Sequence, residues 1–317
     1  MHPRTVILGG TGFIGSHLAE ELIKCKYPVT LFARNGYMLS GLPPLVQHEA
    51  NYIEGDFRDA QTVSGALDGC ELAIHAISST DPGLGNLDPI TDVETNLVPM
   101  IQFLEQVKAH KVKHVMFLSS GGTVYGRTIL PVAEDASTNP ICSYGIVKLA
   151  MEKYLHMYGE TSGVRSTIVR LANTYGERQS PERGQGIVAV LLDRVSKGLP
   201  VYLYGKGEIV RDFIYIEDAV QAMHALLEGV FVRQACSVFN VGTGVGTSIA
   251  KVLSHVEAVT GKPANVEYRD TRSVDVPTNI LDIGKLIRAT GWLPNYSLFS
   301  GICKTWKAMS SKERSCP

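Results

Sequence analysis

The fold of this chain is decided near its N-terminus, by the stretch Thr5-Val-Ile-Leu8-Gly9-Gly10-Thr11-Gly12-Phe13-Ile14-Gly15. A short apolar run with β-branched residues leads into an amphipathic segment with helical spacing. A strand, a glycine turn and a helix start in this order make a dinucleotide site, in which Gly9 allows the tight turn, Gly12 lets backbone approach a pyrophosphate and Gly15 lets helix and strand pack closely. The spacing is G-x-x-G-x-x-G, whereas the commoner fingerprint is G-x-G-x-x-G. A loop that merely turns the chain is the alternative.

Strand-like and helical segments alternate after this start. The strand-like runs are Val29–Ala33, Tyr52–Glu54, Leu72–Ala76, His114–Ser119, Thr167–Leu171 and Val238–Val241. The helical patterns are Phe13–Cys25, Ala60–Leu67, Asp92–His110 and Ser143–Glu160. Repeated strand–helix units build a parallel sheet with right-handed crossovers and helices on both faces. We therefore predict an α/β fold with a doubly wound parallel Rossmann sheet.

The pattern becomes irregular and richer in Gly and Pro after Gly176. We expect residues 1–175 to form the dinucleotide-binding domain and residues 176–317 to form a smaller C-terminal substrate-binding domain. The strand-like run Val238–Val241 suits the main sheet, so roughly residues 212–244 are expected to return to the first domain.

Composition excludes several classes of protein. The net charge of −1 gives no basic field for nucleic acid, and no run of about 18 apolar residues could span a membrane. The N-terminus leads directly into a strand, which leaves no room for a signal peptide. The six cysteines have no C-x-x-C spacing and the nine histidines form no ligand pattern. We expect a cytoplasmic protein with reduced cysteines and no metal site.

Tyr144 and Lys148 lie four residues apart in a helical pattern, so both side chains occupy one face of the helix. Tyr has a free pKa of about 10 and is a poor base at neutral pH. A nearby Lys charge favours the phenolate and moves the Tyr pKa toward a working value. The spacing alone is weak, because both are ordinary helix-surface residues. Beside a dinucleotide site, the pair becomes a candidate acid/base couple.

Further motifs follow in order along the chain. They are Gly55-Asp56, Asn96, Ser119-Ser-Gly-Gly-Thr-Val-Tyr-Gly126, Arg170-Leu-Ala-Asn-Thr-Tyr-Gly176, Arg211-Asp-Phe-Ile-Tyr215, Phe239-Asn-Val-Gly-Thr-Gly244, Arg272 with Asp275, and Gly291-Trp-Leu-Pro294. With the glycine loop and the Tyr144/Lys148 pair they cover almost the whole chain. The chain resembles the extended short-chain dehydrogenase/reductases, in particular nucleotide-sugar epimerases such as the UDP-glucose 4-epimerases.

This resemblance implies a reaction at a sugar hydroxyl. Tyr144 as phenolate would take the hydroxyl proton while the ring carbon passes its hydride to a nicotinamide. Lys148 would bond the nicotinamide ribose and lower the Tyr144 pKa. In an epimerase the 4-keto sugar receives the hydride back on its other face, so the cofactor stays bound. The implied protein is a nucleotide-sugar 4-epimerase.

The hydroxyl partner of Tyr144 departs from the family pattern. The epimerases carry a Ser or Thr three residues before Val-Tyr-Gly, and this chain has Gly121 there. Thr123 lies two residues further and on the same side of an extended segment, so we expect it to replace that hydroxyl. The alternative is that Thr123 only packs beside the cofactor. Gly122-Thr123 offers no carboxylate, which disfavours the dehydratase and decarboxylase reactions of related enzymes.

The cofactor is left open between NAD and NADP. NAD-binding relatives place an Asp where this chain has Ala33, and Arg34 follows, which could bind a 2′-phosphate. Alternatively Arg34 stacks on adenine or lies in solvent while NAD binds. Asp56 resembles the acceptor of the adenine amino group, and a helix cap is its alternative. The resemblance implies these cofactor contacts: Gly9, Gly12, Phe13, Ile14, Gly15, Arg34, Asp56, Phe57, Ala76, Asn96, Tyr144 and Lys148.

The substrate implied is a nucleoside diphosphate sugar. Its two phosphates suit paired arginine contacts, and the resemblance implies that Arg211 and Arg272 supply them. Surface pairs with Asp212 and Asp275 are the alternative. The other substrate contacts implied are Thr123, Asn173 and Tyr202, although core packing explains the strand around Tyr202 equally well.

Two long helical patterns are Asp92–His110 and Ser143–Glu160. In related proteins the corresponding helices pair across a two-fold axis, so a homodimer is expected. The alternative is that their apolar stripes only cover the sheet. Two other functions stay open. Ala33-Arg34 favours an NADPH-dependent nucleotide-sugar 4-ketoreductase, and Gly121 is compatible with a catalytically inactive cofactor-binding regulatory protein.

Overall fold

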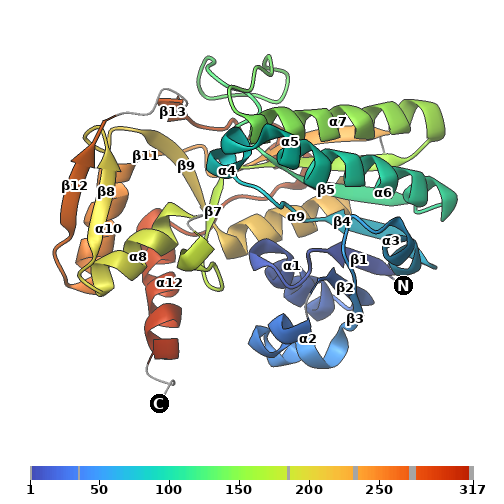
Figure 1. Ribbon diagram of the computed structural model, residues 1–317, viewed down its shortest axis with the longest axis horizontal. Helices are drawn as coiled ribbons and strands as arrows, with labels where there is room; N and C mark the ends of the chain where they lie inside the picture. Colours follow the sequence, from blue (N-terminus) through green and yellow to red (C-terminus); the bar gives the residue numbers. More distant parts are fainter. Residues whose placement is uncertain (1, 35, 184–185, 231–234, 271–275, 314–317) are drawn as a thin grey trace.

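The computed structural model describes residues 2–34, 36–183, 186–230, 235–270 and 276–313. Its centre is a parallel sheet in the order β10-β6-β5-β4-β1-β2-β3 (Figure 1). The strands are β1 (Thr5–Leu8), β2 (Val29–Ala33), β3 (Asn51–Glu54), β4 (Leu72–His75), β5 (His114–Ser120), β6 (Arg165–Leu171) and β10 (Cys236–Val241). The predicted fold class is confirmed, because every strand-like run found in the sequence lies in this sheet.

Helices cover both faces of the sheet. On one face lie α1 (Phe13–Lys24), α2 (Pro44–Glu49), α9 (Ile216–Val230) and α11 (Gly284–Thr290), and on the other lie α3 (Ala60–Leu67), α6 (Val98–Ala109) and α7 (Ser143–Ser162). Side chains of a strand alternate between faces, so Ile7 of β1 belongs to the core under α1 while Val6 and Leu8 belong to the core under α6. Strands buried on both faces are mostly apolar, and in β1 three apolar residues follow Thr5.

The C-terminal part holds two smaller sheets. In one, β9 (Val210–Tyr215) pairs with β7 (Asn173–Tyr175), β11 (Gly246–Ser248) and β13 (Thr278–Asn279). In the other, β8 (Pro200–Tyr204) pairs with β12 (Asn265–Arg269), beside α8 (Ile187–Ser196), α10 (Ile249–Thr260) and α12 (Leu298–Glu313). Short 3₁₀ turns, η1 (Gly36–Gly41) and η3 (Pro181–Arg183), complete the connections. Within residues 212–244, β10 lies in the main sheet and α9 packs against α1 and α11, whereas β9 lies in the smaller sheet.

The helix expected over Asp92–His110 is interrupted. After α4 (Pro82–Leu87), the short α5 (Pro89–Asp92) runs into a π-helical turn, η2 (Val93–Leu97), before α6 begins. Pro99 has no N–H to donate within a regular helix, and the N–H of Val98 bonds the Val93 carbonyl five residues back. Among the described residues, no helix is long and apolar enough to cross a membrane.

Candidate active site

The glycine loop forms a close-packed turn at the start of α1. Gly9 has a φ of 83°, and a Cβ on Gly15 would lie 2.3 Å from the Gly9 carbonyl oxygen, so only glycine fits there. Gly12 is the N-cap of α1 and makes no side-chain capping bond. The first N–H groups of a helix have no partner within it and attract anions. The backbone around Gly12, Phe13 and Ile14 therefore fits a pyrophosphate.

Charged residues lie at the ends of β2 and β3. Arg34, which follows β2, is exposed, and its charge contributes to lowering the pKa of Asp56. The main cause is Arg58, whose Nε and Nη2 bond the two Asp56 oxygens at 3.0 and 2.6 Å and lower that pKa to about 2. Asp59, and not Asp56, caps α3, by accepting from the N–H of Gln61. The capping alternative for Asp56 is therefore wrong.

Of two further residues expected to contact the cofactor, Phe57 lies in the core and Ala76 directly follows β4. Phe57 is 5% exposed and packs edge-on against His75 within the apolar core, so its side chain is part of that core. Ala76 follows β4, and its carbonyl oxygen lies 3.0 Å from the position of a Cβ on Gly9. The end of β4 thus borders the glycine turn.

Tyr144 and Lys148 lie on the first turns of α7, as the sequence predicted. Burial raises the pKa of Tyr144 to about 12, and a hydrogen bond with the Ser78 hydroxyl partly opposes this. The Lys148 ammonium donates to the Leu118 carbonyl oxygen at 3.0 Å, and burial lowers its pKa to about 8. Its Nζ lies 5.7 Å from the centre of the Tyr144 ring. The pair therefore lies at the end of β5, with Lys148 buried and Tyr144 half-buried.

Gly121 and Thr123 follow β5 beside this pair. A Cβ on Gly121 would lie 2.6 Å from Leu281 Cδ1 and 3.1 Å from the Arg170 carbonyl oxygen, which explains why no larger residue stands there. The Thr123 backbone packs against Gly145, the residue after Tyr144. Its Oγ1 is buried and has no hydrogen-bond partner in the structure. An unsatisfied buried hydroxyl is uncommon in folded proteins and suggests a missing ligand atom.

Asn96 belongs to a buried polar cluster. Its Oδ1 accepts from the N–H of Ser79 at 2.9 Å, and its Nδ2 lies within hydrogen-bond distance of Thr80 and Asp92. Ser143, the first residue of α7, joins the cluster through Asp92. The side chain expected to contact the cofactor thus also links η2 to the loop after β4.

A buried ion pair lies beneath the site. Arg170 of β6 holds the Glu152 carboxylate through Nε and Nη2, and the Ser119 hydroxyl donates to the same carboxylate. The Arg170 and Glu152 side chains are about 6% and 5% exposed. Because Glu152 is one turn beyond Lys148, this pair ties α7 to β5 and β6 and fixes the helix that carries Tyr144.

The predicted substrate residues lie in separate elements. Asn173 of β7 borders the turn after β5, since its Oδ1 lies 3.8 Å from the position of a Cβ on Gly122. Arg211 of β9 is half-buried and donates to the carbonyl oxygens of Val210 and Val276. Its partner in register on β13 is Asn279, whose side chain donates to the Gly121 carbonyl oxygen at 3.1 Å. The smaller sheet therefore borders the turn after β5.

Tyr202 lies on β8, in the two-stranded sheet with β12. The ring of Tyr202 on β8 is covered by the Arg269 guanidinium at 3.6 Å and faces Arg194 at 5.2 Å. Arg272 and Asp275 lie outside the described residues. Asp212, the suggested partner of Arg211, instead accepts from Thr243, Gly244 and Leu281.

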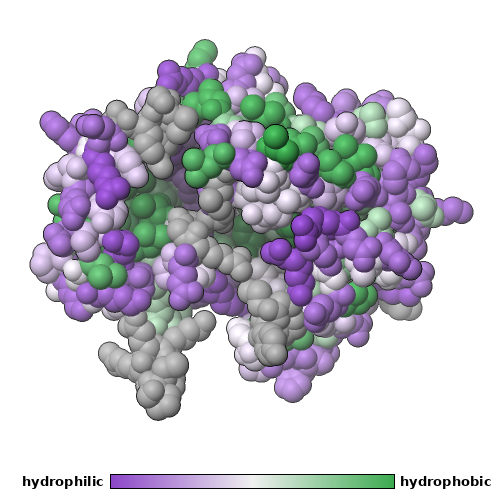
Figure 2. Space-filling model, in the orientation of Figure 1, coloured by the Kyte–Doolittle hydropathy of each residue, from purple (hydrophilic) through white to green (hydrophobic). Residues whose placement is uncertain are grey.

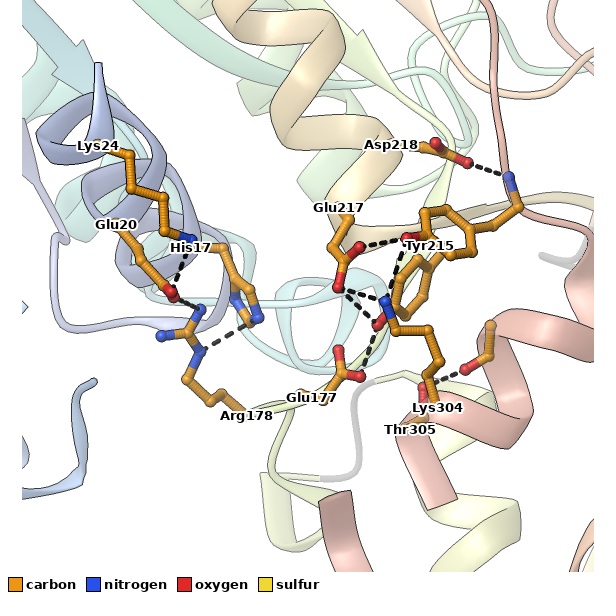
Figure 3. A network of polar contacts seen from close by, with 12 residues as sticks. His17, Glu20, Lys24, Glu177, Arg178, Tyr215, Glu217, Asp218, Lys304 and Thr305 are labelled. Atoms are coloured by element: carbon orange, nitrogen blue, oxygen red, sulfur yellow. Dashed lines mark hydrogen bonds and ion pairs between the residues drawn. The ribbon is translucent and has the colours of Figure 1, made fainter. Parts of the chain in front are cut away.

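A cavity of about 600 Å³ lies between α1, α9 and the segment after β7, and none of the predicted site residues lines it. Figure 3 shows the polar network there, in which Arg178 bonds His17 and Glu20. Lys304 of α12 pairs with Glu217 of α9 at 2.7 Å in the same network. These contacts join the dinucleotide-binding part to the C-terminal part.

One group of possible metal ligands appears on the same face. Ligand atoms of Glu21 and Cys25 in α1 and of His224 in α9 lie within 4.8 Å of one another. The sequence predicted no such cluster, because the residues come from two helices that become neighbours only in the fold. All three are partly exposed, and none is a predicted site residue.

Fold and site together define an extended short-chain dehydrogenase/reductase: a Rossmann sheet, a glycine loop at the start of α1, and Tyr144 with Lys148 on α7. The chain belongs to the NAD dependent epimerase/dehydratase family, whose model matches residues 5–242. The predicted family is thereby confirmed.

Solved structures and curated relatives agree with this assignment. The chain is similar to a UDP-glucose 4-epimerase from Thermotoga maritima crystallised with UDP-glucose, with 31% identity, a TM-score of 0.89 and coverage of 98% and 99% of the two chains. A UDP-glucose 4-epimerase from Thermus thermophilus in complex with NAD is 30% identical, with a TM-score of 0.87 and coverage of 99% and 100%. A dTDP-4-dehydro-6-deoxyglucose reductase from Escherichia coli is 29% identical over 97% of this chain and 98% of its own length.

Sequence reasoning missed four residues that contact or act on Tyr144, Lys148 or the Gly121 turn. Ser78 bonds Tyr144, Glu152 and Asp92 act on Lys148, and Asn279 holds the Gly121 carbonyl. Ser78 and Asn279 stand in segments without periodicity, Asp92 begins an expected helix but belongs to none of the motifs, and Glu152 has only its position one turn after Lys148 as a signal.

Proposed function

We propose that this protein is a nucleotide-sugar 4-epimerase that works through a 4-keto intermediate. Tyr144 takes the proton from the sugar 4-hydroxyl and later returns it, and Lys148 supplies the positive charge that stabilises the phenolate. Thr123 donates a hydrogen bond to the reacting oxygen. A bound nicotinamide cofactor supplies the hydride chemistry, by accepting the hydride of the sugar ring carbon and returning it.

The observation that carries the proposal is the arrangement of three polar groups at one place. The Thr123 hydroxyl is buried without a partner, and its backbone packs against Gly145, beside Tyr144 and one turn before Lys148. A buried hydroxyl without a partner costs about 1–3 kcal/mol. A substrate oxygen bonded by Thr123 and Tyr144 would satisfy it. An inactive regulatory protein would have no need to keep this arrangement.

The glycine loop and the N-terminus of α1 fit the pyrophosphate of NAD, and Asp56 would accept from the adenine amino group. NAD is supported by the Thermus thermophilus relative, which is named as a complex with NAD. Ala33 and exposed Arg34 still permit a 2′-phosphate. Binding of both cofactors should be compared in the wild type and in Arg34→Ala. We expect the variant to lose about tenfold in affinity for NADP and to keep its affinity for NAD within about twofold. Equal losses for both cofactors would exclude a 2′-phosphate role for Arg34.

The proposed substrate is a nucleoside diphosphate sugar bound between the dinucleotide-binding part and residues 176–317. Arg211 supports this, because its strand borders the Gly121 turn through Asn279. Asn173, on the neighbouring β7, would bond a phosphate or sugar oxygen. Uridine is supported by the Thermotoga maritima relative, which is named with UDP-glucose. Because Arg269 covers one face of Tyr202, base stacking on that face would first require the guanidinium to move.

A second candidate is an NADPH-dependent 4-ketoreductase. It is favoured by Ala33-Arg34 and by the similarity to the Escherichia coli reductase. Both candidates use the same Tyr144/Lys148 pair, and they differ in whether the reduced cofactor is regenerated on the enzyme.

One experiment separates the two candidates. The purified protein is incubated with a panel of nucleotide sugars without added cofactor, and the products are separated by chromatography. Formation of the C4 epimer supports the epimerase. Product that appears only from 4-keto sugars, with stoichiometric consumption of NADPH, would replace it by the ketoreductase.

The protein is also proposed to form a homodimer through α6 and α7. Figure 2 shows apolar side chains gathered over α5, α6 and α7 on the face in view. Among the described residues of these helices, exposed apolar side chains include Ile90 of α5, 71% exposed, Val98 of α6, 43% exposed, and Ile146 of α7, 55% exposed. A second copy of the same face, related by a two-fold axis, would cover this patch.

A further inference from the structure

Asp92 is a buried carboxylate for which none of the motifs gives a reason. It is the last residue of α5 and is 0% exposed. The Thr80 hydroxyl donates to its Oδ1 at 2.5 Å, and the Ser143 hydroxyl donates to its Oδ2 at 2.7 Å. In the part of the chain that the structure describes, no Lys, Arg or His forms an ion pair with it. A buried charge without a close cation is costly, so its presence needs a reason.

The carboxylate lies against the backbone that carries Tyr144. A Cβ on Gly85 would be 2.6 Å from Asp92 Oδ2 and 3.3 Å from the Tyr144 nitrogen. Asn86 adds a second tie, because its Oδ1 accepts from the N–H of Ser143 at 2.8 Å. The N-terminus of a helix carries a partial positive charge and favours a nearby anion. Two side chains from outside α7 therefore fix its first turn.

The Asp92 charge also acts on the Tyr144/Lys148 pair. Burial lowers the pKa of Lys148, while Asp92 and Glu152 raise it. Burial raises the pKa of Tyr144, the Ser78 hydrogen bond lowers it, and Cys142, Asp92 and Asp81 raise it. The titratable groups around Lys148 are thus Asp92 of α5, Tyr144 and Glu152 of α7, and His75 of β4. The Lys148 charge contributes to lowering the pKa of His75.

We propose that Asp92 is a positioning residue: through Ser143 it fixes the turn of α7 that carries Tyr144, and its charge acts on Lys148 one turn further along the helix. The catalytic part of this proposal rests on the function proposed above. Removal of the charge and removal of the tie are separable changes. Asp92→Asn removes the charge and keeps the volume, whereas Ser143→Ala keeps the charge and removes the tie.

The effect of the Asp92 charge on Lys148 is tested without substrate. The pKa of Lys148 is measured by NMR titration of the purified chain with ¹³C-labelled lysine. The Lys148 signal is assigned by its loss in Lys148→Met. Because Asp92 raises the pKa of Lys148, Asp92→Asn should move the midpoint down by about 1 pH unit. The matched control is Asp218→Asn, since Asp218 is also 0% exposed and accepts from the N–H groups of Asn295 and Tyr296 at 2.9 Å on the other face of the sheet. It should leave the Lys148 midpoint unchanged. An unmoved midpoint in Asp92→Asn would overturn the role of the charge.

The hydrogen bond between Ser143 and Asp92 is tested by kinetics. This test uses Ser143→Ala and does not depend on whether Asp92→Asn folds. Ser143→Ala should lower kcat about tenfold, as loss of one hydrogen bond allows, with the pH profile unmoved. Asp92→Asn should move the alkaline limb of kcat/KM to lower pH by the same amount as the NMR midpoint. An unchanged kcat in Ser143→Ala would overturn the tie. If the wild type failed to epimerise any nucleotide sugar, the proposed function would be wrong, and the NMR midpoint would still decide the role of the Asp92 charge.

Discussion

The Lys148 ammonium lies 5.7 Å from the centre of the Tyr144 ring and is held by the Leu118 carbonyl oxygen at 3.0 Å. The lysine is therefore fixed by the end of β5, and its distance from the tyrosine does not depend on a bond between the two side chains. Burial moves the two pKa values apart, down to about 8 for Lys148 and up to about 12 for Tyr144. A phenolate at this place depends on positive charge nearby, from Lys148 and from a bound nicotinamide.

Tyr144→Phe should lower kcat by about 10²–10⁴-fold, because it removes the proposed acid/base group. Binding of NAD and thermal stability should stay near wild type, since the ring is kept. Turnover is measured with the nucleotide sugar that the wild type accepts. Tyr154→Phe, a change further along the same helix, is the control and should keep full activity. Unchanged turnover in Tyr144→Phe would rule out the proposed acid/base role.

Thr123→Val should lower kcat roughly tenfold, because it removes one hydrogen bond to the reacting oxygen while it keeps the shape of the side chain. The protein should fold normally, since the Thr123 Oγ1 has no protein partner to lose. Thr123→Ser keeps the hydroxyl and should retain most of the activity. If the valine variant were as active as the wild type, Thr123 would be only a packing residue.

Gly121→Ala should destabilise the protein by about 1–3 kcal/mol, as overpacking of a core does. The reason is the contact of 2.6 Å between the new Cβ and Leu281 Cδ1, since Leu281 is 0% exposed and has little room to move. Gly122→Ala is the matched control next to it, because its nearest neighbour would lie at 3.8 Å. Denaturant unfolding compares the two. Equal stabilities would show that Leu281 yields without cost.

His75→Leu should make the protein less sensitive to acid. Burial lowers the pKa of His75 to about 3, against 6.5 for a free histidine, and its ring lies among Phe57, Phe103 and Phe117. Between these pH values the unfolded chain binds a proton that the native protein does not. Stability therefore falls as pH drops through this window, by roughly 1.4 kcal/mol per pH unit for this residue.

The measurement for this variant is the free energy of unfolding between pH 7 and pH 4, and its slope should be smaller in His75→Leu. His156→Gln, on the exposed side of α7, is the control and should leave the slope unchanged. An identical slope in all three proteins would mean that His75 is not the group that senses acid.

Ile146→Asp should convert a dimer into monomers, because it places a charge in the apolar patch over α6 and α7. The mass in solution is measured by light scattering. Val245→Asp is the control, since Val245 is also exposed, at 62%, but follows β10 in the C-terminal part of the fold. A wild type that is already monomeric at micromolar concentration would contradict the proposed dimer.

Sequence patterns predicted the main sheet to within two residues at each strand end, because alternation and glycine turns are local signals. The helix expected over Asp92–His110 shows their limit. Pro99 is compatible with a helix start, and the sequence did not reveal that a π-helical turn would precede it. That turn places Asp92 and Asn96 inside, where they contact Ser143 and the loop after β4.

The candidate site was predicted less completely than the fold. Lys148 lies near the Tyr144 ring, the Thr123 backbone packs against Gly145, and Asn173 borders Gly122. Phe57 is part of the core, the Asp56 carboxylate is held by Arg58, and Tyr202 is covered by Arg269. In each of these three cases the sequence did not reveal the neighbouring side chain, because the motifs do not show which residues pack or pair in the fold.

The sequence by itself determined the family, the parallel sheet, the glycine turn and the position of Tyr144 one helical turn before Lys148. These features follow from spacing between near neighbours, and backbone geometry translates such spacing directly into structure. Only the tertiary structure decided that Leu281 fills the space at Gly121, that the Thr123 hydroxyl is left without a partner, and that Asp92 holds the start of α7. Those contacts join residues far apart in the chain, and close packing, which periodicity does not encode, selects them.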